Sequence, residues 1–243
     1  MSNHAKPLMP VSLVDISVSE KEEAQKKAQR MVVMMPIITL CIGWGIAELI
    51  YHLTGAKVSY DGKIATLASN DLHWLYFSAV ILCRLNMVIN FTPMIFKAAV
   101  VRGNSGNLRA NMYVYRVSAA NETAESSAEN GTSAMGPVVL EEMGDAGKYN
   151  RGNRSLHHYI ENLPPFLLGL PLAAFVFPAA VFVLTCTFAV GRILHQVGYS
   201  KGYGGHGAGF GLALLSTCVL EGLLLTAALS AAGFEHLYGP SPV

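Results

Sequence analysis

Charged residues are scarce in this chain. They make up 14% of its 243 residues, whereas a soluble domain usually carries about 25%. Hydrophobic residues make up 52%, and the mean hydropathy is +0.38, so we do not expect a soluble globular domain. Neither sign of charge is in excess, because 17 basic residues stand against 16 acidic ones. Without a basic surplus there is no general attraction for polyanions, and nucleic acid is not expected as a partner.

Patterns that bind metals or form disulfide frameworks are also missing. The chain has four cysteines and no CxxC pair among them, so neither a disulfide framework nor a thiolate metal site is indicated. The cysteines lie inside apolar runs, at Cys41, Cys83, Cys186 and Cys218. We expect them to be small buried hydrophobic side chains. No two histidines near the expected membrane boundaries have metal-ligand spacing with an acid, and no metal site is predicted.

Long apolar stretches dominate what is present. A membrane-spanning helix needs about 20 mostly apolar residues, and five stretches have that length. The predicted spans are residues 31–53, 72–101, 155 to about 177, 178–199 and 209 to about 232. Residues 1–30 form a polar N-terminal segment with an amphipathic helical lead-in, where Ser19 and Glu22 have capping-box spacing. Short links between the last three spans predict neighbouring antiparallel helices.

The segment 103–150 is the one large stretch outside these spans. Residues 112–117 and 137–142 are rich in β-formers, and a polar stretch without an apolar face separates them. This pattern predicts a two-stranded hairpin with a mobile tip. Residues 233–243 are expected to form a C-terminal tail.

Basic residues are distributed unevenly between the two sides that five spans define. Thirteen fall on the side of the N-terminus and two on the other. The larger group is Lys6, Lys21, Lys26, Lys27, Arg30, Lys97, Arg102, Arg109, Arg116, Lys148, Arg151, Arg154 and Lys201, and the smaller is Lys57 and Lys63. The positive-inside rule therefore puts the N-terminus and the long loop in the cytosol, or in the matrix of a mitochondrion.

Ionisable side chains within the apolar part form two stripes at helical spacing. The first stripe is Arg151, Arg154, His158 and Glu161, and the second is Arg192, His195 and Tyr199. Such groups are costly in a membrane unless they face a cavity or a partner. Two stripes facing one cleft would suit a small anionic ligand that has its own ammonium group. Alternatively, ion pairs such as Arg192 with Glu161 only hold the bundle together.

Other polar and small residues allow a structural interpretation. Arg84 in the second span could line the same cleft or pair with Glu221 or Glu48. Glu48 and Glu221 are interpreted as interhelical partners rather than catalysts. The glycines of the last span are expected to serve close helix packing. They are Gly207, Gly209 and Gly211.

The order of Arg151, Arg154, Glu161 and Pro164, followed by GRILHQVGYS at residues 191–200, resembles the MAPEG family of membrane-associated proteins in eicosanoid and glutathione metabolism. The resemblance covers roughly residues 72–232. It implies an all-α integral membrane protein with a four-helix bundle, which forms trimers and binds glutathione between subunits. Members typically reside in the endoplasmic reticulum. On this interpretation the span 31–53 is an extra N-terminal transmembrane helix, and 103–150 is a long inserted loop.

The resemblance also implies the site residues. Those matching glutathione-binding positions are Arg151, Arg154, His158, Glu161, Arg192, His195 and Tyr199. His158 stands where the family usually has Asn, and His195 where many members have Tyr. His206 stands seven residues after Tyr199, where the transferases have the Arg that stabilises the glutathione thiolate. Tyr199 or His206 would then be the catalytic residue facing the thiol.

The change from Arg to His206 matters for catalysis. A thiol with a pKa near 8.5 is only a few per cent thiolate at neutral pH, and a nearby cation favours the thiolate. Arginine is always charged, whereas an ordinary histidine is mostly neutral at pH 7. His206 could still donate a hydrogen bond or act as a base. His206 lies in the glycine-rich stretch GYGGHGAGFG. This stretch is interpreted either as a flexible turn or as the support that holds His206 near the thiol. It is not a phosphate loop, because no GK[ST] follows.

Two functions of different class follow. The first is a glutathione-dependent transferase or peroxidase acting on a lipophilic electrophile in the membrane, with glutathione as co-substrate. The second is a non-catalytic MAPEG-fold subunit of a larger membrane complex, for example in the mitochondrial inner membrane. In either case we expect contact with membrane lipid and a homotrimer or larger assembly. The endoplasmic reticulum is the expected location and a mitochondrial membrane the alternative.

Overall fold

The computed structural model describes residues 17–100, 112–117 and 138–233. These residues contain six helices and one two-stranded sheet. The helices are α1 (Val18–Leu53), α2 (Lys57–Ser69), α3 (His73–Val100), α4 (Gly144–Ala174), α5 (Pro178–Lys201) and α6 (Gly207–Ala231). The strands are β1 (Tyr115–Val117) and β2 (Val138–Leu140). The tip of the predicted hairpin and nearly all of the C-terminal tail lie outside the described residues.

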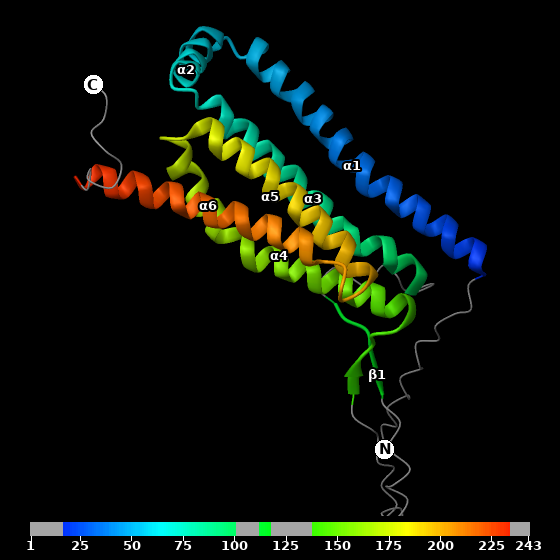
Figure 1. Cartoon of the computed structure of the whole chain (residues 1–243). Helices are drawn as coiled ribbons and strands as arrows, with labels where there is room; N and C mark the ends of the chain where they lie inside the picture. Colours follow the sequence, from blue (N-terminus) through cyan, green and yellow to red (C-terminus); the bar gives the residue numbers. More distant parts are fainter. Residues whose placement is uncertain (1–16, 101–111, 118–137, 234–243) are drawn as a thin grey trace, which may run out of the picture.

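Helices α3 to α6 pack side by side as a four-helix bundle (Figure 1). Its core consists of apolar side chains from all four helices, including Ile89, Leu156, Phe166, Phe188 and Leu220. The rings of Phe166 and Phe188 stack with their centroids 4.2 Å apart. The predicted all-α membrane bundle is therefore confirmed, and its helix ends agree closely with the predicted spans for α3, α5 and α6.

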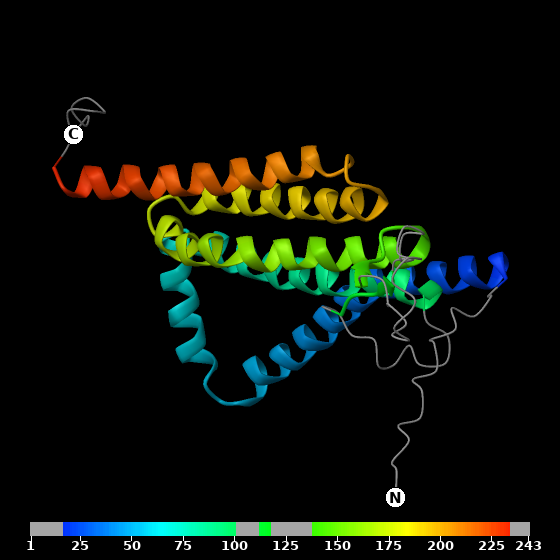
Figure 2. The ribbon, with the colours of Figure 1, turned by 90° about the horizontal axis from the view of Figure 1, so that it is seen from below.

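Helix α1 is the extra N-terminal helix, and it contacts the bundle through α3 (Figure 2). Its first half packs on α3, where Val32 and Pro36 are buried, and its second half diverges from the bundle. The Arg84 Nη1 atom of α3 donates hydrogen bonds to the Pro36 oxygen and to Thr39 Oγ1, both at 3.0 Å. Arg84 therefore attaches α1, and the predicted pairing with Glu221 or Glu48 is wrong.

The two acidic residues expected to pair between helices do not do so. Glu48 accepts a hydrogen bond from Trp44 Nε1 at 2.8 Å and lies 3.4 Å from His52 Nε2, and both partners belong to α1 itself. Glu221 is exposed on the outside of α6. The sequence alone could not assign these partners, because helix rotation decides which face of an apolar helix meets a neighbour.

Four helices, α1, α3, α5 and α6, are long and apolar enough to cross a membrane. The chain is an integral membrane protein. The fifth predicted span corresponds to α4, which lies alongside α3 and α5 but is too polar in its first half to qualify by composition. It also begins well before the predicted residue 155. Gly144, with φ +59°, turns the chain from β2 into α4, a backbone conformation that glycine adopts without strain.

Residues 54–71, for which no element was predicted, contain the helix α2, and none of its residues is buried. One further local prediction needs correction. The capping box of α1 uses Ser17 and Glu20 instead of Ser19 and Glu22. The Glu20 nitrogen donates to Ser17 Oγ at 3.3 Å, and the Ser17 nitrogen donates to Glu20 Oε2 at 3.2 Å. Both pairs have the same spacing, so the pattern could not distinguish them.

The expected burial of small residues is also only partly correct. Cys41, Cys83 and Cys218 are exposed and Cys186 is half-buried, because the apolar runs that contain them face outward toward lipid. Of the three glycines predicted to pack at the start of α6, only Gly209 serves close packing. A Cβ there would lie 2.2 Å from the His195 nitrogen, whereas Gly207 and Gly211 have nothing within 4 Å.

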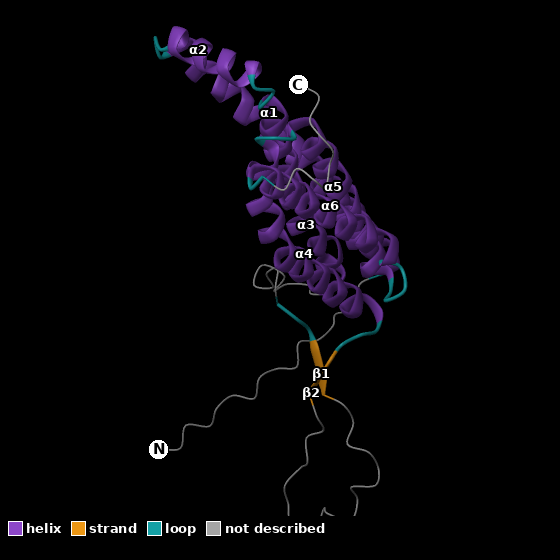
Figure 3. Ribbon diagram, turned by 60° about the vertical axis from the view of Figure 1, so that its left-hand side comes forward, coloured by secondary structure: helices purple, strands orange, loops and turns teal. Residues whose placement is uncertain are grey.

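The predicted hairpin is confirmed. Strands β1 and β2 pair antiparallel, with Tyr115 opposite Leu140 and Val117 opposite Val138. They project from one end of the bundle, and α2 lies at the other (Figure 3). The start of α1 lies at the hairpin end, where Lys21 Nζ is 3.4 Å from Asp145 Oδ2 of α4. The turn between α5 and α6 lies at the same end (Figure 1).

Candidate functional site

The candidate site lies where α4, α5 and the start of α6 meet near the hairpin end. Glycines bring α5 and α6 together there. A Cβ on Gly198 would lie 2.0 Å from the Gly205 oxygen, and one on Gly209 would lie 2.2 Å from the His195 nitrogen. This close approach puts His206, the N-cap of α6, against the last turns of α5. The glycine-rich stretch therefore forms a tight, specific connection rather than a loose one.

The inner cavity has a volume of about 200 Å³. It is lined by Arg154, Ser155, His158, His195, Tyr199, His206 and Phe210. The ring of His206 lies 5.1 Å from that of Tyr199 and 5.5 Å from that of His195, measured between centroids. The His158 and His195 rings stack at 5.1 Å. Both predicted catalytic residues and four of the predicted ligands thus share one cavity.

Hydrogen bonds orient some of these rings and leave others free. The buried His195 Nδ1 is hydrogen-bonded to Ser155 Oγ at 2.9 Å. The His206 Nδ1 atom is buried without a hydrogen-bond partner, so it is available to a ligand. Among the described residues no group of three His, Cys, Asp or Glu side chains is arranged to hold a metal ion. The histidine rings place hydrogen-bond donors and acceptors on the inner cavity.

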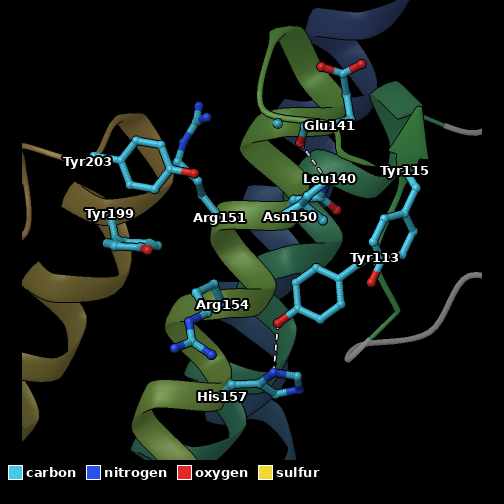
Figure 4. A pocket seen from close by; sticks show the side chains of 11 residues that line it. Tyr113, Tyr115, Leu140, Glu141, Asn150, Arg151, Arg154, His157, Tyr199 and Tyr203 are labelled. Atoms are coloured by element: carbon cyan, nitrogen blue, oxygen red, sulfur yellow. Dashed lines mark hydrogen bonds between the residues drawn. The ribbon is translucent and has the colours of Figure 1, made fainter. Parts of the chain in front are cut away.

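The outer cavity adjoins the inner one and has a volume of about 410 Å³ (Figure 4). Arg154 and Tyr199 line both cavities. Helix α4 forms the floor of the outer cavity, the end of α5 and the following turn form one wall, and the hairpin forms the other. Its lining is Tyr113, Tyr115, Leu140, Glu141, Gly147, Asn150, Arg151, Arg154, His157, Tyr199 and Tyr203.

Side chains of α4 hold the hairpin in place. The buried Asn150 donates from Nδ2 to the oxygens of Val114 and Glu141, both at 2.7 Å, and accepts from the Val114 nitrogen at 2.9 Å. The Tyr113 hydroxyl is hydrogen-bonded to His157 Nδ1 at 2.7 Å (Figure 4). These residues were not predicted as part of the site. Asn150 stands four residues before Arg154, and this helical spacing is the signal that could have found it.

The three predicted arginines have different environments. Arg151 donates to the Glu142 oxygen at 2.8 Å and to the Ser200 oxygen at 3.3 Å, so it joins the hairpin to the end of α5. Arg154 is exposed, and its guanidinium makes no hydrogen bond or ion pair with any residue that the structure describes. Arg154 is therefore the free cation of the site.

Arg192 is buried deep in the bundle, with 2% of its surface exposed. Its guanidinium lies over the Tyr159 ring at 5.4 Å, and its Nη1 atom is 3.4 Å from His158 Nδ1. The Nε and Nη2 atoms have no hydrogen-bond partner. The alternative of an Arg192 to Glu161 ion pair is wrong, because Glu161 is exposed on the surface of α4 and lines neither cavity.

Two tyrosines outside the membrane helices, Tyr113 and Tyr203, keep their protons. Burial raises the pKa of Tyr113 above its usual value near 10, and Arg154 opposes part of that rise. Burial also raises the pKa of Tyr203, and the neighbouring Glu142 adds to the effect. Both phenols therefore remain neutral at physiological pH and can donate hydrogen bonds at the outer cavity.

Comparison with known proteins gives one family. No curated protein and no solved structure matches the chain significantly. The MAPEG family model matches residues 96–228, which is more than half of the chain and extends from the end of α3 through most of α6. This range contains both predicted motifs and all residues of the two cavities. The chain therefore belongs to the MAPEG family.

Proposed function

We propose that the protein is a glutathione-dependent transferase or peroxidase that acts on a lipophilic electrophile dissolved in the membrane. Its family is a membrane fold of glutathione-related transferases and eicosanoid metabolism. The observation that carries the proposal is the free Arg154 guanidinium on a cavity that also contains Tyr199 and His206. A free cation beside hydrogen-bond donors suits a ligand that has both carboxylates and a thiol.

Each part of glutathione has a complementary group in the proposal. Arg154 pairs with a carboxylate, and Tyr199 or His206 faces the thiol in the inner cavity. His158 and His195 complete that cavity, and Arg192, which lines neither cavity, contributes its positive charge through His158 Nδ1, 3.4 Å from its Nη1 atom. Arg151 positions the end of α5 through its bond to the Ser200 oxygen. Glu161, further along the polar face of α4, is available to the ligand's ammonium group.

The reaction needs the thiolate. The thiol proton leaves to a base, for which His206 Nδ1 is available, and the sulfur then attacks the electrophile. In a transferase reaction a new carbon–sulfur bond forms while the leaving group departs or a ring opens. A neutral histidine favours the thiolate less than an arginine would. We therefore expect slower conjugation than an arginine at residue 206 would give.

A titration with glutathione tests the proposal. Purified wild-type protein should bind glutathione and conjugate 1-chloro-2,4-dinitrobenzene. Arg154→Gln should weaken glutathione binding about tenfold or more, because a hydrogen-bonded charge pair contributes about 1.5 to 3 kcal/mol. Arg116→Gln is the matched control, since this exposed hairpin arginine lines neither cavity. Wild-type protein that binds no glutathione would contradict the proposal.

The second candidate is a non-catalytic subunit of a larger membrane complex. The observation that favours it is the combination of a histidine at residue 206 with an added helix whose second half leaves the bundle (Figure 2). This function would be favoured if the protein bound glutathione without conjugating it, or if it neither bound nor conjugated glutathione. We propose the endoplasmic reticulum as the location, and a mitochondrial membrane in the second case.

A further inference from the structure

The outer cavity contains a wall that the glutathione proposal does not use. Tyr113, Tyr115, Leu140 and Glu141 of the hairpin form this wall. None of them lines the inner cavity. The cavity is also the larger of the two, at about 410 Å³ against about 200 Å³. It therefore has space and a lining of its own.

The hairpin wall is held by buried polar groups. Asn150 and Asn153 are 2% and 0% exposed. The first makes three hydrogen bonds to the hairpin, and Asn153 Nδ2 donates to the Met112 oxygen at 2.7 Å. Burying an amide is costly unless it is hydrogen-bonded. Because both buried amides are hydrogen-bonded to this segment, they hold the base of the hairpin against α4.

The charges along this cavity do not cancel. Arg151 is occupied by the oxygens of Glu142 and Ser200. The Glu141 carboxylate accepts from the Met143 nitrogen at 2.9 Å and lies 3.9 Å from Arg116 Nε. Arg154 has no such partner among the residues that the structure describes. One free positive charge thus points into the space between α4 and the end of α5 (Figure 4).

Tyrosine rings line both walls of the outer cavity. Tyr199 and Tyr203 lie on the α5 side, and Tyr113 and Tyr115 on the hairpin side (Figure 4). Tyrosine offers a flat apolar face together with a polar edge. Four such rings in a cavity that also contains one free cation favour a ligand with a flat apolar body and a negatively charged end.

We propose that the outer cavity binds an amphiphile in which a single carboxylate or phosphate group adjoins a flat apolar body. Arg154 pairs with the anionic group, and the tyrosine rings contact the body. The cavity lies at the hairpin end of the bundle, where the apolar helices end, so the ligand can arrive from the membrane surface. Arg154 is shared with the proposed glutathione site, so the two ligands would compete for it, but the proposal does not rest on glutathione binding because the hairpin residues belong to the outer cavity alone.

Three matched probes test the charge requirement on the full-length protein in detergent. They are 2-naphthoate, 2-naphthyl phosphate and the uncharged 2-naphthalenemethanol. Both anions should bind at least about tenfold more tightly than the alcohol, as expected for a charge-assisted pair. Arg154→Gln should remove that difference. Arg30→Gln is the control that should preserve it, because this exposed arginine of α1 lines neither cavity. Equal affinity of the wild-type protein for all three probes would overturn the proposal.

A hairpin variant separates this site from the glutathione site. Tyr115 is exposed, so Tyr115→Ala should leave the fold intact. It should weaken naphthoate binding about threefold to tenfold through lost ring contact and leave glutathione affinity unchanged. An unchanged naphthoate affinity would overturn the proposed wall contact. Naphthoate binding by a wild-type protein that does not bind glutathione would contradict the proposed function and leave this inference standing.

Nanodiscs distinguish the two sources of the anionic group. Wild-type protein is compared in phosphatidylcholine alone and in phosphatidylcholine with phosphatidic acid. If a lipid headgroup is the occupant, phosphatidic acid should weaken naphthoate binding to the wild type and have no effect on Arg154→Gln. If a free amphiphile is the occupant, naphthoate should bind equally in both lipids and still require Arg154. Naphthoate binding that is independent of Arg154 in both lipids would overturn the inference.

Discussion

At the scale of single residues, the buried Arg192 distinguishes a ligand site from a structural ion pair. Its Nε and Nη2 atoms have no hydrogen-bond partner and it forms no ion pair with Glu161. Removing an unpaired buried charge relieves a desolvation cost, whereas breaking a buried pair costs about 3 to 5 kcal/mol. Arg192 is therefore a buried cation that has no anionic partner among the residues that the structure describes.

We predict that Arg192→Met leaves the melting temperature unchanged or raised while glutathione affinity falls about tenfold. The loss of the contact with the Tyr159 ring costs about 0.5 to 2 kcal/mol. This cost offsets part of the stability gained by removing the buried charge. Thermal unfolding in detergent and a glutathione titration measure the two effects. Arg84→Met is the matched control. Its Nη1 atom has two partners on α1, so this variant should melt lower.

His206 tests the chemistry of the inner cavity. Replacing it with arginine should lower the pKa of the bound glutathione thiol by about 1 to 2, as expected for a cation within roughly 4 to 6 Å. Thiolate would then appear at lower pH, which its ultraviolet absorbance measures. An unchanged titration with intact binding would mean that residue 206 does not face the sulfur. The catalytic hypothesis would then lose its main support.

The sequence predicted which ionisable residues gather, because their helical spacing defines a face independently of the rest of the fold. It assigned their partners less well. Arg154, His158, His195, Tyr199 and His206 do share a cavity. Which arginine lacks a partner depends on backbone carbonyl oxygens such as that of Ser200. The positions of such oxygens cannot be predicted from the sequence.

At the scale of helices, close packing of α5 and α6 creates the inner cavity. We predict that Gly209→Ala destabilises the protein by several kcal/mol, because its Cβ would overlap the His195 backbone nitrogen and overpacking of this kind is costly. Gly211 lies two residues further along α6, and a Cβ there would have no atom within 4 Å. Gly211→Ala should therefore be neutral or stabilising by about 0.5 to 1 kcal/mol. Unfolding midpoints compare the two. Equal midpoints would contradict the proposed contact.

Elements with a strong apolar signal were predictable, and those shaped by tertiary contacts were not. The spans of α3, α5 and α6 follow from long apolar runs. The first part of α4 is polar, and its burial depends on the inserted hairpin that Asn150 binds. Helix α2 lacks buried residues altogether, so no periodic pattern could reveal it.

At the scale of the whole molecule, two carboxylates indicate that the bundle has further partners. Glu161 and Glu221 are exposed on helices that lie in the bundle, and a charge facing lipid is expensive. We predict an oligomer, the trimer that is general in the family, in which subunit contacts or ligands cover these groups. Mass measurement in mild detergent tests this. A strictly monomeric mass with the fold retained would contradict it.

The last prediction concerns orientation in the membrane. The start of α1, the hairpin and the turn between α5 and α6 lie at one end of the bundle, whereas α2 and the end of α6 lie at the other (Figure 1). The basic residues are concentrated at the first end, and the positive-inside rule assigns that end to the cytosol or matrix. The N-terminus and hairpin should therefore be on one side, and the C-terminus and α2 on the opposite side. Protease treatment of sealed vesicles tests this orientation with epitopes at both termini and in α2, because the protease cleaves only the epitopes outside the vesicle. If both termini were cleaved together, an even number of crossings would be required and the orientation of the candidate site would have to be reassigned.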